Sequence, residues 1–370
     1  MWHFPTSMVA QAVAIVVAIV AAVAGVGLGF YAGYEYRGSP ASSPSGVSNS
    51  TLSILGAGTL NTLFPQLASL LVNETPGVSA PIAAQTYEGS IDITTAITSL
   101  HATTDVAAVA DFRLIPQDLE PTYANYEVVF GATPEVLAYN PSLPAFAGIN
   151  SSNWAEKLVA DVSTPNNAPF GVWNASTDPN GFNEIFSLEL QGLFENNSTS
   201  AFYSHFYNGA VGGLAVPNPT TTRLEHESQA ALLLNTGVVS AVITYRSFAA
   251  TNHLSYVSFS PIVGLSANNS TALADYSKVS TSIIGSSGAI TAVAAAPVLF
   301  AITVPLNAPN PALGEAFVHL LLSPQGSAII SEGGAFTPIF PGWSDRVGSV
   351  PSNLAPDVVP LPSWAASYLT

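Results

Sequence analysis

Four short segments carry small, hydroxyl or acidic residues at points where an extended stretch of the chain gives way to a helical one. They are Gly58-Thr59, Gly89-Ser90, Asp178-Pro179-Asn180-Gly181 and Glu227-Ser228. The first turn of a helix exposes backbone N–H groups without partners and a partial positive charge. Several such helix ends that meet in one cleft would bind an anion without any Lys or Arg. Each segment alone is more simply explained as a helix cap, worth about 1 kcal/mol.

The charge balance of the chain excludes several other classes of protein. The 370 residues include 23 acidic and 7 basic ones, so the formal net charge is −16, and 48% of the residues are hydrophobic. Seven scattered basic residues cannot form a face that follows a phosphate backbone, which excludes nucleic acid as a partner. Cysteine is absent, which excludes a disulfide scaffold, a thiol nucleophile and a Cys-ligated zinc site. The high apolar fraction excludes a mainly disordered chain.

Residues 1–37 contain a candidate membrane anchor. Residues 12–33 include no charged residue and are almost all apolar, which is long enough for a helix that crosses a bilayer. The alternative is a cleaved secretory signal, but no Lys or Arg precedes the run and the run is long for a signal core. We predict one N-terminal transmembrane helix, followed by a Ser-, Pro- and Gly-rich linker at residues 38–50.

Asn-x-Ser/Thr sequons occur eight times and indicate an exported surface that carries glycans. Arg37, directly after the apolar run, is weaker evidence for the opposite orientation. We therefore predict a single-pass protein of the cell membrane whose C-terminal domain is extracellular. The predicted glycosylation sites are Asn49, Asn73, Asn150, Asn174, Asn196, Asn197, Asn268 and Asn269.

The elements that must position the four segments alternate in type. Thr51–Leu55 predicts a strand and precedes a helical stripe of leucines. A strand near Val78–Gln85 precedes a helix that should turn Leu100 inward. This alternation predicts an α/β fold with mostly parallel sheets, followed by an irregular, Pro-rich tail at residues 346–370. Further strands are expected at Val106–Ala110, Glu127–Phe130, Val136–Tyr139, Val238–Thr244 and Val298–Val304.

A longer ordered set of motifs runs through the same region. Its members are Ala57-Gly58-Thr59-Leu60, Gly89-Ser90, Asp105-Val106, Val109-Ala110-Asp111-Phe112, Leu114-Ile115, Asn153-Trp154, Phe170-Gly171, Asp178-Pro179-Asn180-Gly181-Phe182, Tyr245-Arg246-Ser247, Ile302-Thr303-Val304-Pro305 and Asn307-Ala308. In order and spacing this set resembles the archaeal tungstate/molybdate-binding proteins of ABC importers, which are relatives of the bacterial molybdate-binding proteins. The resemblance covers about residues 51–342.

The resemblance implies a bilobal, type II periplasmic-binding-protein fold. Lobe I would comprise residues 51–128 and 306–345, and lobe II residues 129–305, with two crossing strands as the hinge. The ligand would lie in the cleft and close the lobes when it binds. By the same resemblance the protein is not an enzyme. It would deliver tungstate or molybdate to an ABC permease and its ATPase, and it would need no cofactor besides this ligand.

The resemblance also implies residues that hold the oxyanion. Thr59 stands where the family has a Ser, and Ser90 matches the family's Gly-Ser motif. Ala110 and Tyr245 fall within matching motifs and complete the predicted oxyanion-binding set with the two carboxylates described next. One departure is Phe182-Asn183, which replaces an aromatic-Arg pair of the family and removes a positive charge.

Two carboxylates are implied as ligands of the metal atom itself. In the archaeal members these are an Asp in an Asp-Pro motif and a Glu that begins a later helix. Asp178 matches the first and Glu227 the second, with Glu225 as the alternative to Glu227. W(VI) and Mo(VI) can expand from four oxygen ligands to six, so two carboxylate oxygens complete an octahedron. Sulfur in sulfate cannot expand in this way and would meet only repulsion.

Two other functions are compatible with the same residues. Asp178 and Glu227 could form the carboxylate pair of a hydrolase such as a glycosidase, although no Trp-rich sugar platform lies near either one in the sequence. The chain could also be a structural or adhesive surface protein that kept the fold without oxyanion binding, which the anchor, the glycans and the tail would suit. A melting temperature that no oxyanion shifts would favour this second alternative.

Overall fold

The computed structural model describes residues 50–369 except residues 76, 165, 166 and 226. The predicted N-terminal anchor and the linker up to residue 49 therefore lie outside the described residues. Among the residues that are described, no helix is both long and apolar enough to cross a membrane. Residues 49–370 form one compact unit.

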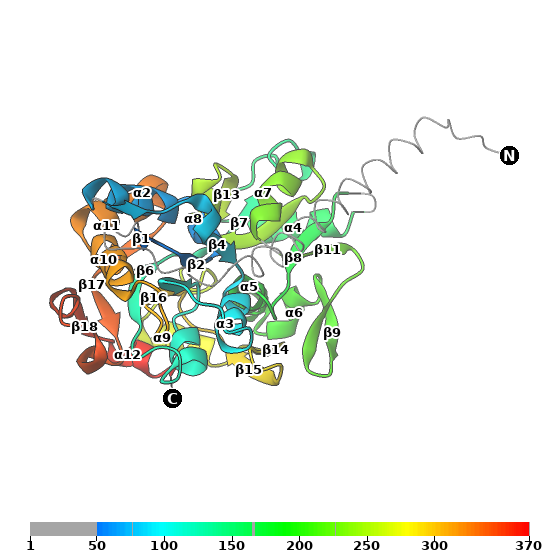
Figure 1. Ribbon diagram of the computed structural model, residues 1–370. Coiled ribbons are helices and arrows are strands. Elements are labelled where there is room, and N and C mark those ends of the chain that lie inside the picture. The colour runs from blue at the N-terminus through cyan, green and yellow to red at the C-terminus, as the bar shows by residue number, and fades with distance from the viewer. Residues whose placement is uncertain (1–49, 76, 165–166, 226, 370) are drawn as a thin grey trace. The chain divides into compact units, whose positions relative to one another are not determined.

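A seven-stranded sheet forms one part of this unit. It includes residues 129–132 and 299–303, which were expected in lobe II, and from here on lobe I means this sheet and its helices. Its strands are β2 (Ile54–Ala57), β4 (Gln85–Glu88), β5 (Val106–Val109), β6 (Val128–Ala132), β16 (Leu299–Thr303), β17 (Thr337–Ser344) and β18 (Val358–Pro360). Their order is β18-β17-β6-β16-β5-β2-β4, so the sheet joins strands from both ends of the described chain (Figure 1). The helices of lobe I are α2 (Phe64–Glu74), α3 (Ser90–Thr98), α10 (Pro311–Leu321) and α11 (Pro324–Ile330).

The core of lobe I is apolar on both faces of this sheet. All four residues of β5 are buried, as expected of a central strand covered on two sides. Aromatic rings pack around the sheet: the ring centroids of Phe64 and Phe317 lie 5.1 Å apart and those of Phe300 and Phe336 lie 4.8 Å apart. Edge-to-face pairs of this kind add to the stability that burial alone provides. This rigid core holds the turns that follow β2, β4 and β5.

A five-stranded sheet forms lobe II. Its strands are β7 (Glu135–Tyr139), β8 (Phe170–Trp173), β11 (Thr221–Leu224), β12 (Ala241–Tyr245) and β13 (Ser255–Ser258). They lie in the order β11-β8-β12-β7-β13. The helices of lobe II are α4 (Trp154–Val162), α5 (Pro179–Asn196), α6 (Thr199–Tyr203), α7 (Glu227–Thr236), α8 (Arg246–Thr251) and α9 (Ser270–Tyr276).

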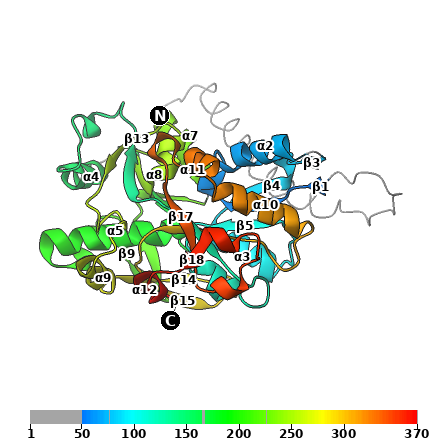
Figure 2. The ribbon, with the colours of Figure 1, turned by 90° about the vertical axis from the view of Figure 1, so that its left-hand side faces the viewer.

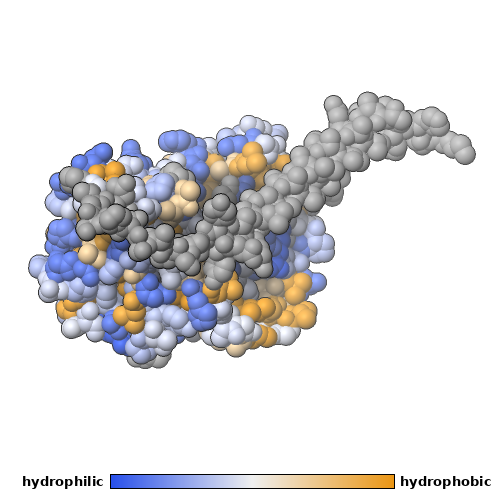
Figure 3. Space-filling model, in the orientation of Figure 1, coloured by the Kyte–Doolittle hydropathy of each residue, from blue (hydrophilic) through white to orange (hydrophobic). Residues whose placement is uncertain are grey.

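A smaller four-stranded sheet extends lobe II. It consists of β9 (Tyr207–Val211), β10 (Leu214–Pro217), β14 (Ser280–Ile284) and β15 (Ile290–Ala294). Its exposed side chains include Val211, Ile284 and Ile290. Figure 3 shows apolar residues at the lower right, where Figure 1 places β9 and β14, while polar residues cover much of the remaining face. A short pair, β1 (Ser50–Thr51) and β3 (Val78–Ser79), completes the sheets.

The predicted α/β class is confirmed, but the prediction of mostly parallel sheets is wrong. In lobe I, β16 runs antiparallel to both β5 and β6, and in lobe II, β7 runs antiparallel to β12 and β13. The physical reason is the path of the chain between the lobes. It leaves lobe I along β6 and returns along β16, so these two neighbours must run in opposite directions.

Two local expectations also differ from the structure. Pro81, which has no N–H to donate to a sheet, interrupts the predicted strand at 78–85, so the strand that pairs with β2 is β4 instead. Leu100 was expected inward but is 48% exposed, because α3 ends at Thr98. The prediction of an irregular tail at residues 346–370 is also wrong in part, because this C-terminal segment contains β18, which pairs with β17, and a short helix, α12 (Ser363–Ala366) (Figure 2).

Candidate functional site

Thr59 and Ser90 lie at two neighbouring strand-to-helix turns of lobe I. Thr59 follows β2 in a short 3-10 turn, η1 (Gly58–Leu60), and Ser90 is the first residue of α3. Both residues are 1% exposed. Since β2 pairs in parallel with β4 and with β5, the carboxyl ends of the three strands meet at one edge of the sheet, where α/β proteins usually bind ligands. Ala110 follows β5 at that edge, and its N–H donates to Ser90 Oγ over 2.8 Å.

Asp178 and Glu227 stand at the start of two helices of lobe II. Asp178 is the N-cap of α5, where it accepts a hydrogen bond from the N–H of Asn180 over 2.9 Å. Glu227 is the first residue of α7 and is 3% exposed. Its Oε1 accepts hydrogen bonds from Thr244 Oγ1 and from Asn180 Nδ2, each over 3.3 Å. Asn180 and Thr244 therefore orient the Glu227 carboxylate.

Tyr245, at the end of β12, is buried beside the same region. Its hydroxyl accepts a hydrogen bond from Asn183 Nδ2 over 3.3 Å. Asn183 is the residue that replaces the family's Arg, so the departure seen in the sequence supplies a neutral donor to the tyrosine. Burial raises the pKa of the Tyr245 hydroxyl well above its usual range, and the charges of Asp178, Glu135 and Glu227 raise it further. The tyrosine is therefore a neutral hydrogen-bonding group.

The turn before α3 presses directly against the turn before α5. A Cβ atom added to Gly89 would lie 2.2 Å from the carbonyl oxygen of Thr177, so only glycine permits this approach. The N–H of Ile91 donates to the same carbonyl over 3.2 Å. These contacts join lobe I to the residue before Asp178, and they bring the start of α3 next to the start of α5.

A second contact between the lobes involves Glu227. Its Oε2 lies 3.4 Å from the position that a Cβ atom would take on Gly58, and Thr59 is one of the groups that hydrogen-bond its carboxylate. Thr59 Oγ1 also lies 3.3 Å from the hydroxyl of Ser247, at the start of α8. The structure thus brings Thr59, Ser90, Ala110, Asp178, Glu227 and Tyr245, the predicted oxyanion-binding set, to one buried region between the lobes.

Glu135 is a residue of this region that the sequence patterns did not single out. It is the first residue of β7 and is 0% exposed. The available signal was an acidic residue after Thr-Pro at the head of an otherwise apolar strand. We call Asp178, Glu227 and Glu135 the cleft carboxyls.

The cleft carboxyls are buried near one another, so the charge on each opposes the ionisation of the others. Burial raises the pKa of Glu135 well above its usual range, and the charges of Glu227, Glu184 and Asp178 raise it further. Burial also raises the pKa of Glu227, with a further contribution from Asp178, and hydrogen bonds from Thr244 and Thr59 offset part of this. Glu135 and Glu227 therefore favour their protonated forms in the folded protein.

Glu225, the alternative to Glu227, is placed differently. It is exposed, its Oε1 lies 3.1 Å from Arg223 Nε, and its Oε2 accepts a hydrogen bond from Asn174 Nδ2 over 2.7 Å. Asn174 is also a predicted glycosylation site, and it is half-buried with that nitrogen already bonded. Asn49 lies outside the described residues. The other predicted glycosylation sites, which are all exposed, are Asn73, Asn150, Asn196, Asn197, Asn268 and Asn269.

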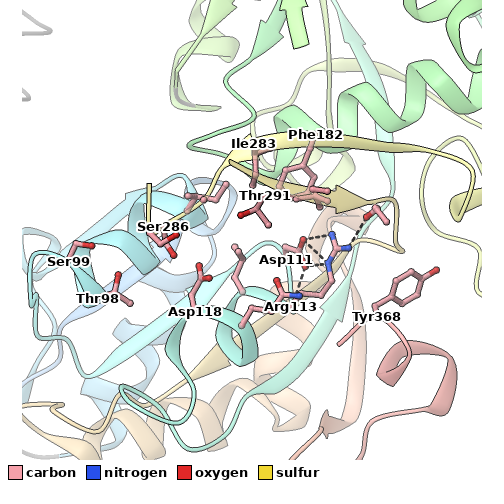
Figure 4. Close-up of a pocket in the computed structure, with 18 of the residues that line it drawn as sticks. Thr98, Ser99, Asp111, Arg113, Asp118, Phe182, Ile283, Ser286, Thr291 and Tyr368 are labelled. Carbon is pink, nitrogen blue, oxygen red and sulfur yellow. Dashed lines mark hydrogen bonds and ion pairs between the residues drawn. The ribbon is translucent and has the colours of Figure 1, made fainter. Parts of the chain in front are cut away.

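A separate cavity of about 800 Å³ adjoins α3 and the hairpin of β14 and β15. Figure 4 shows Arg113 and Asp111 paired at its wall, with Phe182 and Tyr368 on other sides. Arg113 Nη2 lies 2.6 Å from Asp111 Oδ2, and its Nη1 donates to the carbonyl of Ala294 over 2.8 Å. The guanidinium is therefore engaged by protein groups, and its role in the cavity wall is structural.

The class of the protein follows from this two-lobed architecture together with a match to a family model. Residues 38–335 match the bacterial extracellular solute-binding proteins, and the chain belongs to this family. Solved structures agree on the fold. The periplasmic molybdate-binding protein of Azotobacter vinelandii superposes with a TM-score of 0.53 at 14% identity, over 77% of this chain and 98% of that one. The fold is thus the α/β fold of periplasmic binding proteins.

Particular relatives are archaeal. The molybdate/tungstate-binding protein WtpA of Pyrococcus abyssi is 27% identical over 305 residues, which cover 78% of this chain and 85% of the relative. The protein of the same name from Thermococcus kodakarensis is 25% identical over 261 residues, covering 66% of this chain and 69% of the relative. The resemblance seen in the motifs is therefore confirmed as a similarity over most of the chain.

Proposed function

We propose that this solute-binding protein captures tungstate or molybdate between its lobes and delivers it to an ABC permease. The observation that carries the proposal is the meeting of Asp178 and Glu227 with the hydroxyl groups of Thr59 and Ser90 in one buried region. These four residues come from four separate turns and from both lobes. Relatives named for binding the same two oxyanions support it.

Carboxylates beside a dianion require a physical reason, and the coordination chemistry of the metal supplies one. Two carboxylate oxygens, one from Asp178 and one from Glu227, would raise a tetrahedral oxyanion of W(VI) or Mo(VI) to six oxygen ligands. The oxo groups would accept hydrogen bonds from Thr59, Ser90, the N–H of Ala110 and Tyr245. The Ala110 N–H and the Ser90 hydroxyl already lie 2.8 Å apart, so one oxo group could accept hydrogen bonds from both.

The proposal includes the setting of the protein. An N-terminal helix within residues 1–37 would tether the two lobes outside the cell membrane, with glycans on the exposed asparagines. The partners would be the permease and its ATPase. The protein would perform no chemical reaction and require no cofactor besides its ligand.

Isothermal titration with tungstate, molybdate and sulfate tests the proposed ligand. We expect tight binding of one or both metal oxyanions and at least 100-fold weaker binding of sulfate, a difference of about 2.7 kcal/mol. Equal affinity for sulfate would contradict the role of the carboxylates. Binding of no oxyanion, with no shift of the melting temperature, would contradict the function itself.

Glu227→Gln and Glu225→Gln form a matched pair of variants. They replace the same kind of carboxyl group two residues apart, but only Glu227 is buried between the lobes. We expect Glu227→Gln to weaken tungstate binding by about 100-fold, or about 2.7 kcal/mol, and Glu225→Gln to change it by less than about threefold. The opposite ranking would assign the second metal ligand to Glu225.

A further inference from the structure

A second group of acidic residues lies at the other end of the lobe I sheet. Glu120 follows the turn η3 (Ile115–Leu119), Glu127 precedes β6, and Asp345 follows β17. One carboxylate oxygen from each residue lies within 4.8 Å of those from the other two. We call these three residues the edge cluster.

The directions of the strands separate the edge cluster from the cleft. Strand β16 is antiparallel to both β5 and β6, so β5 and β6 point the same way. The carboxyl end of β5 leads to Ala110, and the carboxyl end of β6 leads to Glu135, both in the buried region between the lobes. Glu127 lies at the amino end of β6, where the antiparallel β17 also ends. The edge cluster is therefore a site distinct from the oxyanion region.

The floor of the edge cluster holds buried carboxylate oxygens without partners. Glu127 is 0% exposed; its Oε1 accepts a hydrogen bond from the N–H of Asp345 over 2.9 Å. The side chain of Glu120 is also 0% exposed, and Arg346 Nε lies 2.6 Å from its Oε2. Within the described chain, Oε2 of Glu127 and Oε1 of Glu120 have no hydrogen-bond partner. Buried polar atoms of this kind require an explanation, and an unseen ion is one of the usual ones.

The charges of the cluster and the oxygen atoms that it offers as metal ligands indicate which kind of ion it would bind. Three carboxylates and the Arg346 guanidinium together carry a charge of about −2 when ionised, which one divalent cation neutralises. All the available ligands are oxygens, which hard cations prefer. Calcium takes six to eight oxygens and readily uses several carboxylates, whereas magnesium usually uses one or two and keeps its water. Asp345 is exposed, so the cluster opens to solvent on that side and water can complete the shell.

We propose that Glu120, Glu127 and Asp345 bind a calcium ion that fastens the start of the C-terminal segment, directly after β17, to the residues before β6. Asp345 is the first residue after β17, and the segment that follows contains β18 and α12. Two of its last residues, Ser367 and Tyr368, line the 800 Å³ cavity. The ion would join the start of this segment to Glu120 and Glu127, which both precede β6 in the sequence. The binding of calcium would therefore stabilise the wall of that cavity from a distance.

Calcium titration of the full chain at neutral pH tests the proposal. We expect calcium chloride to raise the melting temperature, EDTA to reverse the rise, and native mass spectrometry to show one bound ion. No shift and no bound ion at millimolar calcium would overturn the proposal and would mean that the buried carboxyls hold protons instead.

Variants in the C-terminal segment distinguish a specific calcium site from nonspecific attraction of calcium to a chain of net charge −16. We expect Asp345→Asn, on the exposed rim where folding is tolerant, to weaken calcium binding at least tenfold. Asp357→Asn is the control, because Asp357 lies in the same segment but pairs with His319 Nδ1 over 2.7 Å. An equal loss in both variants, or in neither, would overturn the site. Glu127→Gln should abolish binding, and if it does not fold, the Asp345 and Asp357 pair still decides.

Discussion

The cleft carboxyls and the edge cluster place the same kind of side chain near opposite edges of the seven-stranded sheet. The first group belongs to elements of lobe II and the second to segments next to β6 and β17 of lobe I. In the cleft, the acidic groups share a buried region with hydroxyls and backbone N–H groups, such as those of Thr59, Ser90 and Ala110. In the edge cluster, one guanidinium lies beside the acidic groups, and some of their own carboxylate oxygens have no partner in the described part of the chain.

This difference shows that the number of acidic residues in a site does not predict whether its ligand is an anion or a cation. Donors around the cleft carboxyls can hold the oxo groups of an anion while the carboxylates reach its metal atom. The edge cluster offers almost only acceptors, which suit a bare cation. The neighbours of a carboxylate, rather than its own charge, distinguish the two proposed sites.

The largest expected effect comes from Gly89→Ala. Gly89 has a φ of −61°, which alanine adopts freely, so the variant adds only a methyl group against Thr177. We expect the lobes to be held apart and tungstate affinity to fall at least 100-fold, about 2.7 kcal/mol, while the calcium response is unchanged. Titration with both ions measures this. Gly348→Ala is the control, since no heavy atom lies within 4 Å of the added Cβ. Unchanged tungstate affinity would show that closure does not depend on this contact.

Glu135→Gln is expected to change how stability depends on pH. The folded protein raises the pKa of Glu135 well above 4.5, so its contribution to stability is full below pH 4.5 and is lost as the pH rises toward the folded value. Glutamine does not titrate. The variant should therefore gain stability relative to the parent as the pH rises, by up to about 1.4 kcal/mol per pH unit.

Urea unfolding of the ligand-free protein at pH 4, 6 and 8 measures this gain. Glu332→Gln serves as the control because Glu332 is exposed, and its curve should run parallel to that of the parent at every pH. A Glu135→Gln curve that also stays parallel would mean that Glu135 ionises normally in the folded protein.

The smallest expected effect is that of Arg346→Met in the edge cluster. Burial and the charge of Asp345 raise the pKa of Glu120 to about 7, although Arg346 lowers it. Glu120 is thus protonated at pH 5 and ionised at pH 8. In the presence of EDTA we expect the variant to lose about 1 kcal/mol of stability at pH 8 and less at pH 5. The loss is modest because the Arg346 side chain is 44% exposed and screened by water.

Urea unfolding at the two pH values, with EDTA and then with calcium, measures this loss. Lys278→Met removes a cation from the ion pair with Asp275 and should show no such pH dependence. If Arg346→Met loses equal stability at pH 5 and pH 8, the contribution of Arg346 to stability does not depend on the ionisation of Glu120.

Residues whose role depends on a local turn were predictable from the sequence. Thr59, Ser90 and Asp178 each follow or begin an element in a short motif, and the helix that comes next dictates their position. Strands β5 and β7 were predicted within one residue of their bounds because each is a short apolar run. Residues whose role depends on a distant partner were not predictable. Glu135 gained its importance from charges on α5 and α7, which are far away in sequence.

Sequence patterns were therefore enough to predict the α/β class, the resemblance to a binding-protein family and the turns that carry most of the proposed oxyanion site. Three features depended on the tertiary structure. It placed Glu227 rather than Glu225 between the lobes, and it made β16 run antiparallel to its neighbours. It also brought Glu120 and Glu127 next to Asp345, which lies more than 200 residues later in the sequence. The physical reason is that short-range patterns encode capping, burial and turns, whereas electrostatic neighbours and strand direction depend on where the chain returns.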